Sequence, residues 1–250
     1  SHLALFDVAT KTLDTLTSEL EDDDSPAWSP DGRSIAFVRE APPEPNKGTD
    51  SDIWVVEARA GAKARPLTDF AGPDNGRVSW SPDGKWIAFT RGDDPKYSAY
   101  HLNKLALVPA DGSAPAHVVT AALDRPVSSP RFTADGKAVL ATIADDRSDE
   151  LVRIDVADGR VARLIDGKRA VSGYSALPDG RVAALVSTPD RPPEVFAIDA
   201  GSAGRASPRQ LSHQNDSLFA ELQLASVGGE TSRSKDGTEV YFNKPGAVEA

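Results

Sequence analysis

The chain has 250 residues, of which 39% are hydrophobic and 26% charged, enough for one large all-β domain or two ordinary domains. Its 28 Lys and Arg residues against 38 Asp and Glu residues give a formal net charge of -10, which repels nucleic-acid backbones and anionic membrane surfaces. The absence of Cys excludes disulfides, thiolate metal sites and a cysteine nucleophile. The four histidines, His2, His101, His117 and His213, lack metal-ligand spacing, so we expect no metal and no cofactor.

No apolar run approaches the roughly 20 residues that a membrane span needs, and the N-terminus lacks the basic start and apolar core of a signal peptide. We therefore expect a soluble protein with neither a nucleic-acid nor a membrane partner. The sequence leaves the compartment open between cytoplasm and periplasm, and it leaves the oligomeric state open.

The first predicted elements are two short apolar strands, Leu3–Phe6 and Thr15–Thr17. They are followed by the segment Pro26–Gly32, which reads PAWSPDG. Its Asp-Gly pair lies between two apolar stretches and is a strong hairpin signal, because Gly reaches positive φ without a Cβ clash.

This hairpin segment recurs along the chain. The spacing between successive Asp-Gly pairs is 52, 52, 44 and 57 residues, which is typical of β-propeller blades. The Asp residues of the five copies, the last of them the weakest, are Asp31, Asp83, Asp135, Asp179 and Asp236.

Each repeat then supplies further apolar stretches, and four strands per repeat make one blade. The predicted second strands are Ile35–Val38, Ile87–Thr90 and Val139–Thr142. The predicted third strands are Ile53–Val56, Leu105–Val108, Leu151–Ile154 and Val195–Ile198. The predicted fourth strands end at Leu67-Thr68, Val119-Thr120, Leu164-Ile165 and Leu211-Ser212.

The two ends of the chain read as half-blades. Leu3–Thr17 matches third and fourth strands, whereas Asp236-Gly237 with Glu239–Phe242 resembles a first hairpin. We expect an all-β fold, a β-propeller of four complete four-stranded antiparallel blades plus two half-blades. The half-blades either pair to close a five-bladed ring, which would remove exposed sheet edges, or belong to a fragment of a larger propeller; we favour the fragment.

The Trp-Ser-Pro-Asp-Gly repeats resemble Tol-type periplasmic propellers and the propellers of prolyl-oligopeptidase-family serine peptidases. Three segments resemble the dipeptidyl and acylaminoacyl peptidases of the second group in particular: Asp94–Val108, Leu123–Pro130 and Leu211–Leu222. In that family the last segment ends the propeller, and a stretch resembling Ser234–Pro245 leads into an α/β-hydrolase domain. Between Val240 and Lys244 this chain is shorter than the family pattern.

The resemblance implies a division of the chain at its C-terminal part. Residues 1–228 would form the propeller, partial or five-bladed, and residues 229–250 a half-blade or linker toward an α/β-hydrolase domain that this chain lacks. The propeller of such a peptidase covers the hydrolase active site and limits substrates to short peptides. The implied partners are therefore the hydrolase domain of the parent polypeptide and its peptide substrates. The alternative is a free-standing Tol-type propeller that acts as a protein-interaction scaffold.

We assign no catalytic, cofactor-binding or metal residue to this chain. A serine hydrolase needs a G-x-S-x-G elbow, and the partial match at Ser175, after Gly173-Tyr174, lacks the second Gly and occupies a first-strand position. His213 lies near Asp216, but no activated serine accompanies them, so a turn-capping polar cluster is favoured over a catalytic pair.

Three further features favour structural interpretations. The acidic run Glu21–Asp24 lacks the alternate spacing of a calcium loop and is expected to be a solvated loop. The long connection from Glu40 to Asp52 either borders a substrate channel, touches a neighbouring subunit or is a disordered surface loop. Trp28, Trp80 and Phe132 share one blade position and are expected to be equivalent, buried core residues.

Overall fold

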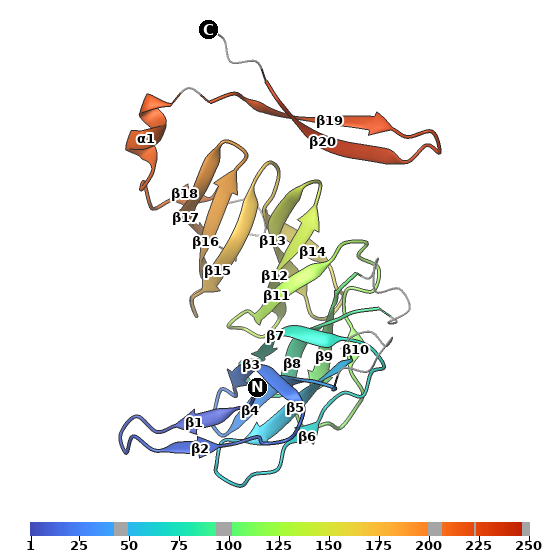
Figure 1. The fold of residues 1–250 in the computed structure, drawn as a ribbon, viewed down its shortest axis with the longest axis vertical. Coiled ribbons are helices and arrows are strands. Elements are labelled where there is room, and N and C mark those ends of the chain that lie inside the picture. Colours follow the sequence, from blue (N-terminus) through green and yellow to red (C-terminus); the bar gives the residue numbers. More distant parts are fainter. Residues whose placement is uncertain (43–49, 94–101, 200–206, 223, 247–250) are drawn as a thin grey trace. The chain divides into compact units, whose positions relative to one another are not determined.

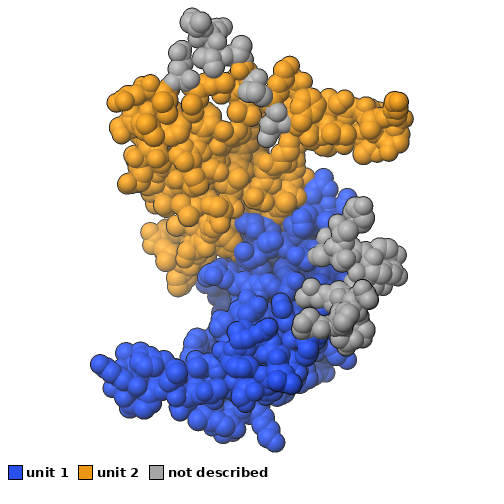
Figure 2. Space-filling view, viewed as in Figure 1, with its two compact units in different colours: residues 1–142, 153–161 blue, residues 143–152, 162–250 orange. Residues whose placement is uncertain are grey.

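The computed structural model describes residues 1–42, 50–93, 102–199, 207–222 and 224–246. The described chain forms two compact units, residues 1–142 with 153–161 and residues 143–152 with 162–250, which we call unit 1 and unit 2 (Figure 2). The segments Asp94–Tyr100 and Pro43–Gly48, which carry part of the resemblance and part of the long connection, lie outside the described residues.

Four antiparallel sheets have four strands each, with the strands of a sheet in chain order (Figure 1). The first consists of β3 (Asp22–Trp28), β4 (Ser34–Glu40), β5 (Ser51–Glu57) and β6 (Arg65–Pro66). The second consists of β7 (Asp74–Trp80), β8 (Trp86–Arg91), β9 (Lys104–Pro109) and β10 (His117–Val118). The third consists of β11 (Val127–Phe132), β12 (Ala138–Asp145), β13 (Ser148–Asp155) and β14 (Val161–Ile165). The fourth consists of β15 (Ala170–Ala176), β16 (Arg181–Thr188), β17 (Arg191–Asp199) and β18 (Arg209–Gln210).

The two ends form separate two-stranded sheets, as the half-blade pattern predicts. β1 (Ala4–Phe6) pairs with β2 (Leu13–Thr15), and β19 (Val227–Arg233) pairs with β20 (Glu239–Pro245). The helix of the described chain, α1 (Asp216–Glu221), joins the fourth sheet to the last hairpin (Figure 1). The predicted all-β propeller of four complete blades and two half-blades is confirmed.

The Asp-Gly signal produces the same turn in each copy. In the first copy the Gly32 amide donates to the Ser29 carbonyl at 2.9 Å, and Gly32 has φ +69°, a conformation that favours glycine. The Ser29 hydroxyl donates to the Asp31 carboxylate at 2.6 Å, and that carboxylate accepts the Arg33 amide. Equivalent hydroxyl–carboxylate bonds close the turns at Ser81–Asp83, Thr133–Asp135 and Ser234–Asp236.

A second repeated contact fixes the third strand of several blades. The backbone amide of the third strand donates to a hydroxyl that follows the fourth strand, at 2.8 to 2.9 Å. The amide–hydroxyl pairs are Leu3–Thr17, Ile53–Thr68, Leu105–Thr120 and Val195–Ser212. The hydroxyl satisfies a buried donor at a position where the short fourth strand has ended.

The central strands are apolar at consecutive positions because each inner sheet of unit 1 is covered on both faces. Side chains alternate along β4, so Ile35 and Phe37 pack with Leu3 and Leu16 of the first half-blade. Ala36 and Val38 pack on the other face, in a cluster that contains Ile87, Phe89, Ala106 and Val108 of the second sheet. Burial on both faces explains why the strand lacks the alternation of a half-exposed sheet.

The prediction that three aromatics occupy equivalent buried sites is wrong for Trp28. Trp80 is half-buried, packs on the shared cluster and donates its Nε1–H to the Ala27 carbonyl of the first blade at 3.0 Å. Phe132 is also half-buried, and its backbone amide donates to the Ser79 hydroxyl of the second blade. Trp28 is 52% exposed, because the two-stranded sheet on its side, β1 with β2, corresponds to the third and fourth strands of a blade and lacks the first two.

Candidate functional site

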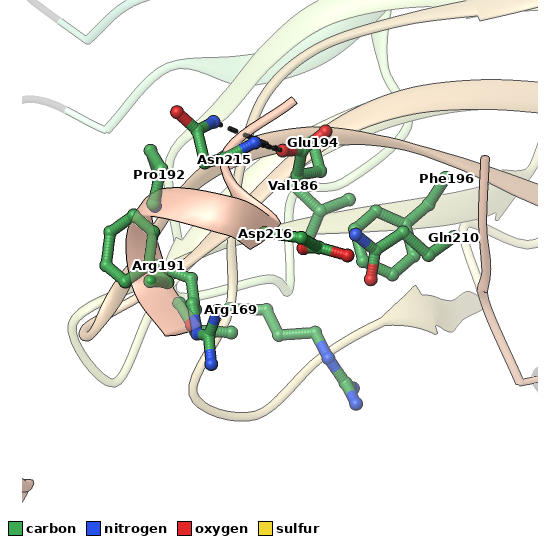
Figure 3. A pocket seen from close by; sticks show the side chains of 11 residues that line it. Arg169, Val186, Arg191, Pro192, Glu194, Phe196, Gln210, Asn215 and Asp216 are labelled. Atoms are coloured by element: carbon green, nitrogen blue, oxygen red, sulfur yellow. Dashed lines mark hydrogen bonds between the residues drawn. The ribbon is translucent and has the colours of Figure 1, made fainter. Parts of the chain in front are cut away.

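The candidate site is a cavity of about 320 Å³ in unit 2, between the outer strands of the fourth blade and the helix that follows it (Figure 3). Val186 and Thr188 come from β16, and Gln210 comes from β18. β17 supplies Arg191, Pro192, Glu194 and Phe196. The start of α1 and its cap supply Asn215, Asp216 and Phe219, and the loop before β15 supplies Arg169.

A buried carboxylate fixes the helix against the blade. Glu194 is 7% exposed and accepts hydrogen bonds from the Ser212 hydroxyl and from the backbone and side-chain nitrogens of Asn215, the latter two at 3.1 Å (Figure 3). These donors, the Ser212 hydroxyl first, lower the pKa of Glu194 below its usual value. Because Asn215 is the residue before α1, the Glu194 carboxylate positions the helix start.

Two guanidinium groups lie on the side of the cavity opposite Glu194 and Asn215 in Figure 3. The Arg191 guanidinium lies over the Phe219 ring, 4.9 Å from its centroid. The Arg169 guanidinium donates a long bond of 3.4 Å to the Asp166 carbonyl. Among the described residues neither arginine forms an ion pair, and both line the cavity.

His213 and Asp216 lie at the turn that leads into α1, where the sequence places a polar cluster. Their side chains meet at 2.8 Å, but they are 59% and 57% exposed, and Asp216 begins α1, where a negative charge stabilises the helix. Asp216 also lines the cavity, whereas the pair belongs to the polar turn between β18 and α1.

Ser175 lies in the middle of β15, opposite Ala183 of β16. A nucleophile elbow requires a strained strand-to-helix turn, and a ladder position provides neither that turn nor the paired backbone donors for an oxyanion. Ser175 therefore has the strand position that the repeat predicts.

The expectation of a loop at Glu21–Asp24 is wrong, because β3 begins at Asp22, although Asp22 and Asp24 are exposed as expected. Asp23 is buried and forms a double hydrogen bond with Arg39, at 2.7 and 3.0 Å, across the β3–β4 ladder. The described residues hold no group of three or more His, Asp or Glu side chains that could bind a metal ion.

The described ends of the connection between Glu40 and Asp52 line a cavity of about 390 Å³ in unit 1. The Ala41 amide donates to the Asp50 carbonyl at 2.9 Å, so the β-ladder continues one step beyond β4. Burial raises the pKa of Asp52 to about 6, although the Thr68 hydroxyl and the Phe70 amide both donate to its carboxylate. In the described part of the chain, no helix is long and apolar enough to cross a membrane.

Repeated four-stranded antiparallel sheets with shared turns and packed faces define the class of this protein: it is a β-propeller chain. Solved propellers have the same architecture. The β-propeller domain of the Trilobed protease from Pyrococcus furiosus is 17% identical with a TM-score of 0.57, and the match covers 86% of this chain and 77% of that one.

Two other kinds of protein share the fold. Acylaminoacyl peptidase from Pyrococcus horikoshii is 16% identical with a TM-score of 0.59 over 94% of this chain and 45% of the peptidase. TolB from Acinetobacter baumannii is 20% identical with a TM-score of 0.60 over 99% of this chain and 60% of TolB.

In sequence, the chain is similar to dipeptidyl-peptidase 5 of Arthroderma otae, with 25% identity over 158 residues. That match covers 59% of this chain but spans only 22% of the peptidase. No family model matches the sequence. The resemblance to peptidase propellers and Tol-type propellers that the repeats predict is therefore confirmed at the level of the fold.

Sequence reasoning did not find the cavity beside Arg169 and Arg191. These two arginines belong to a loop and to the start of an outer strand, and neither lies in the repeated Asp-Gly segment that made the blades visible. Only the approach of α1 to β17, through Glu194 and Asn215, brings them to one cavity.

Proposed function

We propose that this chain is the non-catalytic β-propeller portion of a prolyl-oligopeptidase-family serine peptidase. In this proposal residues 1–228 form the propeller, and residues 229–250 lead toward a hydrolase domain. The propeller admits short peptides to that domain and excludes larger substrates by size.

The observation that carries the proposal is the end of the fourth blade. The segment Leu211–Leu222, on which the family resemblance depends most, leaves β18, forms α1 and is anchored to the blade by Glu194. It is followed by a hairpin with the Asp236-Gly237 turn, as expected for the exit toward a hydrolase domain. The similarity to dipeptidyl-peptidase 5 and to acylaminoacyl peptidase, each longer than this chain, supports the same proposal.

A fluorophosphonate probe tests this proposal, because it reacts only with activated serines. We expect no labelling of the 250-residue chain, and we expect labelling of the natural polypeptide, where its reading frame continues past Ala250, at a serine in a G-x-S-x-G segment. Stoichiometric labelling of this chain that disappears in Ser175→Ala would overturn the non-catalytic assignment. A reading frame without such a segment would contradict the peptidase proposal.

A second function, a free-standing Tol-type interaction scaffold, is favoured by the match to TolB over 99% of this chain. It predicts that the natural polypeptide contains no hydrolase segment and that the propeller forms a stable complex with another protein. The same reading-frame test separates the two functions.

A further inference from the structure

A second cavity of about 360 Å³ in unit 2 shares two lining residues with the cavity beside α1. Arg169 and Thr188 line both, and we call the two cavities together the Arg169 groove. The second cavity is lined by the β12–β13 turn, the loop before β15 and the β19 strand. The cavity beside α1, at about 320 Å³, has room for an amino-acid-sized group rather than for a single ion.

The carboxylates of the Arg169 groove are hydrogen-bonded to neighbouring groups, whereas three of its cations have no carboxylate partner among the described residues. Glu194 is occupied by Ser212 and Asn215, and Asp216 is occupied by His213. In the second cavity Asp146 pairs with Arg147 at 3.0 Å. In the part of the chain that the structure describes, Lys168, Arg169 and Arg191 have no carboxylate partner.

An apolar wall adjoins the available cations. Val186, Pro192, Phe196 and Phe219 line the first cavity, and the Phe219 ring supports the Arg191 guanidinium from one side. A guanidinium held on an aromatic ring is partly ordered in advance and keeps its edge donors for a planar carboxylate. The site thus suits a carboxylate attached to an apolar group.

The surrounding charges argue against a polyanion. The chain has a net charge of -10, and Glu194 and Asp216 lie in the same cavity as the arginines. A phosphate-rich ligand would meet these carboxylates, whereas one carboxylate can lie against the arginine side alone.

We propose that the Arg169 groove binds a carboxylate of a short peptide, with an adjacent apolar side chain packed on the apolar wall that contains Val186 and Phe196. Arg169 and Arg191 hold the carboxylate by charge-assisted hydrogen bonds. This inference does not depend on the proposed peptidase function, since it concerns binding by the propeller chain itself.

Isothermal titration of this chain with the tripeptide Gly-Ala-Phe, as the free acid and as the C-terminal amide, tests the proposal. We expect the amide to bind about tenfold more weakly, the effect of losing one charge-assisted hydrogen bond. A third peptide, Gly-Asp-Phe amide, distinguishes the source of the carboxylate: binding comparable to the free acid assigns the site to acidic side chains, and weak binding assigns it to the peptide C-terminus.

The double substitution Arg169→Gln with Arg191→Gln should remove the preference for the free acid. Arg59→Gln is the matched control, because Arg59 is an exposed arginine of unit 1 and its removal changes the net charge by the same amount per site. Each variant is checked by circular dichroism, and single variants replace the double one if it does not fold.

Three results would overturn the proposal: equal binding of all three peptides, no binding of any peptide at about 10 mM, a concentration above most weak peptide affinities, or a double variant that keeps the acid preference of the unmodified chain. The comparison of acid and amide on the unmodified chain decides the matter even where a variant fails to fold.

Discussion

Buried arginine–aspartate pairs lie at the same position in the first two blades. Asp23 pairs with Arg39, and Asp74 pairs with Arg91 through two bonds of 2.7 and 2.6 Å, in each case between directly opposed residues of the first two strands. Both carboxylates are almost completely buried. Each guanidinium also lies 4.5 Å from an aromatic ring, Trp54 or Phe70. The bidentate geometry offsets the cost of removing two charges from water.

Breaking one pair should lower the free energy of unfolding strongly, whereas replacing both of its residues by apolar ones should lower it much less. Asp23→Ala leaves the Arg39 guanidinium buried without its main partner, so we expect a loss of roughly 3 to 5 kcal/mol in unfolding free energy. At the equivalent sequence positions the third blade has Val127 and Ile143, which are buried apolar residues. Asp23→Val combined with Arg39→Ile should therefore lose far less than Asp23→Ala alone. Urea denaturation measures both, and a double variant as unstable as the single one would contradict this account.

Asp52 provides a pH-dependent contribution. Its pKa in the folded chain, about 6, lies above the unfolded value, so the folded state holds the proton more tightly and stability rises as pH falls from above 6 toward 4. Asn at this position keeps an oxygen that accepts from Thr68 and Phe70 but has no charge to bury. We expect Asp52→Asn to be more stable at pH 7 by on the order of 1 kcal/mol after solvent screening, an advantage that disappears near pH 4.

Thermal unfolding from pH 4 to pH 8 measures this difference. The exposed Asp14 is the control, because Asp14→Asn removes the same charge from an exposed strand. A constant difference between Asp52→Asn and the unmodified chain over that range would show that ionisation of Asp52 does not limit stability.

At the scale of elements, hydrogen bonds from single polar side chains complete the blades where the strands are short. The fourth strands have as few as two residues, and a hydroxyl beyond their end takes over the bond to the third-strand amide. The same reasoning applies to α1: none of its residues is buried, and its half-buried Phe219 lies against the Arg191 guanidinium. Its position depends on the bonds from Ser212 and Asn215 to Glu194.

Substitution of Glu194 should therefore release the helix without unfolding the blade. In Glu194→Ala the donors of Ser212 and Asn215 lose their acceptor, and we expect amide hydrogen exchange at residues 215–221 to accelerate at least tenfold while the β16 amides stay protected. Glu194→Gln keeps an acceptor oxygen and is the matched control, expected to retain most of the protection. Unchanged exchange in Glu194→Ala would mean that other contacts hold α1.

At the scale of the whole molecule, stability depends on packing between blades. In unit 1 the apolar cluster shared by the first two sheets draws on five of their strands, β4, β5, β7, β8 and β9, and on Leu67, with Trp80 packed against it. Because each blade contributes side chains to both of its faces, a blade cannot bury its apolar surface alone.

Trp80→Ala should cost roughly 3 to 5 kcal/mol, because it removes a large aromatic from the surface between two blades together with its bond to Ala27. Trp28→Ala should cost less than half as much, since Trp28 occupies the same sequence position but is 52% exposed. Chemical denaturation compares the two. Equal losses would show that the neighbouring blade contributes little at this position, and a loss below about 1 kcal/mol for Trp80→Ala would mean that the repeat alignment misplaces the core.

The sequence by itself determined the class of fold, because the blade signal is local: an Asp-Gly turn that recurs along the chain, with apolar strands on either side of it. It also predicted that Ser175 is a strand residue and that His213 and Asp216 form a turn cluster. The exposure of Trp28, the buried pairing of Asp23 with Arg39, and the meeting of Arg169 with Arg191 at one groove were decided by tertiary structure. Each depends on which element packs against another, and a repeat pattern carries information about single blades but not about the residues that lie opposite them.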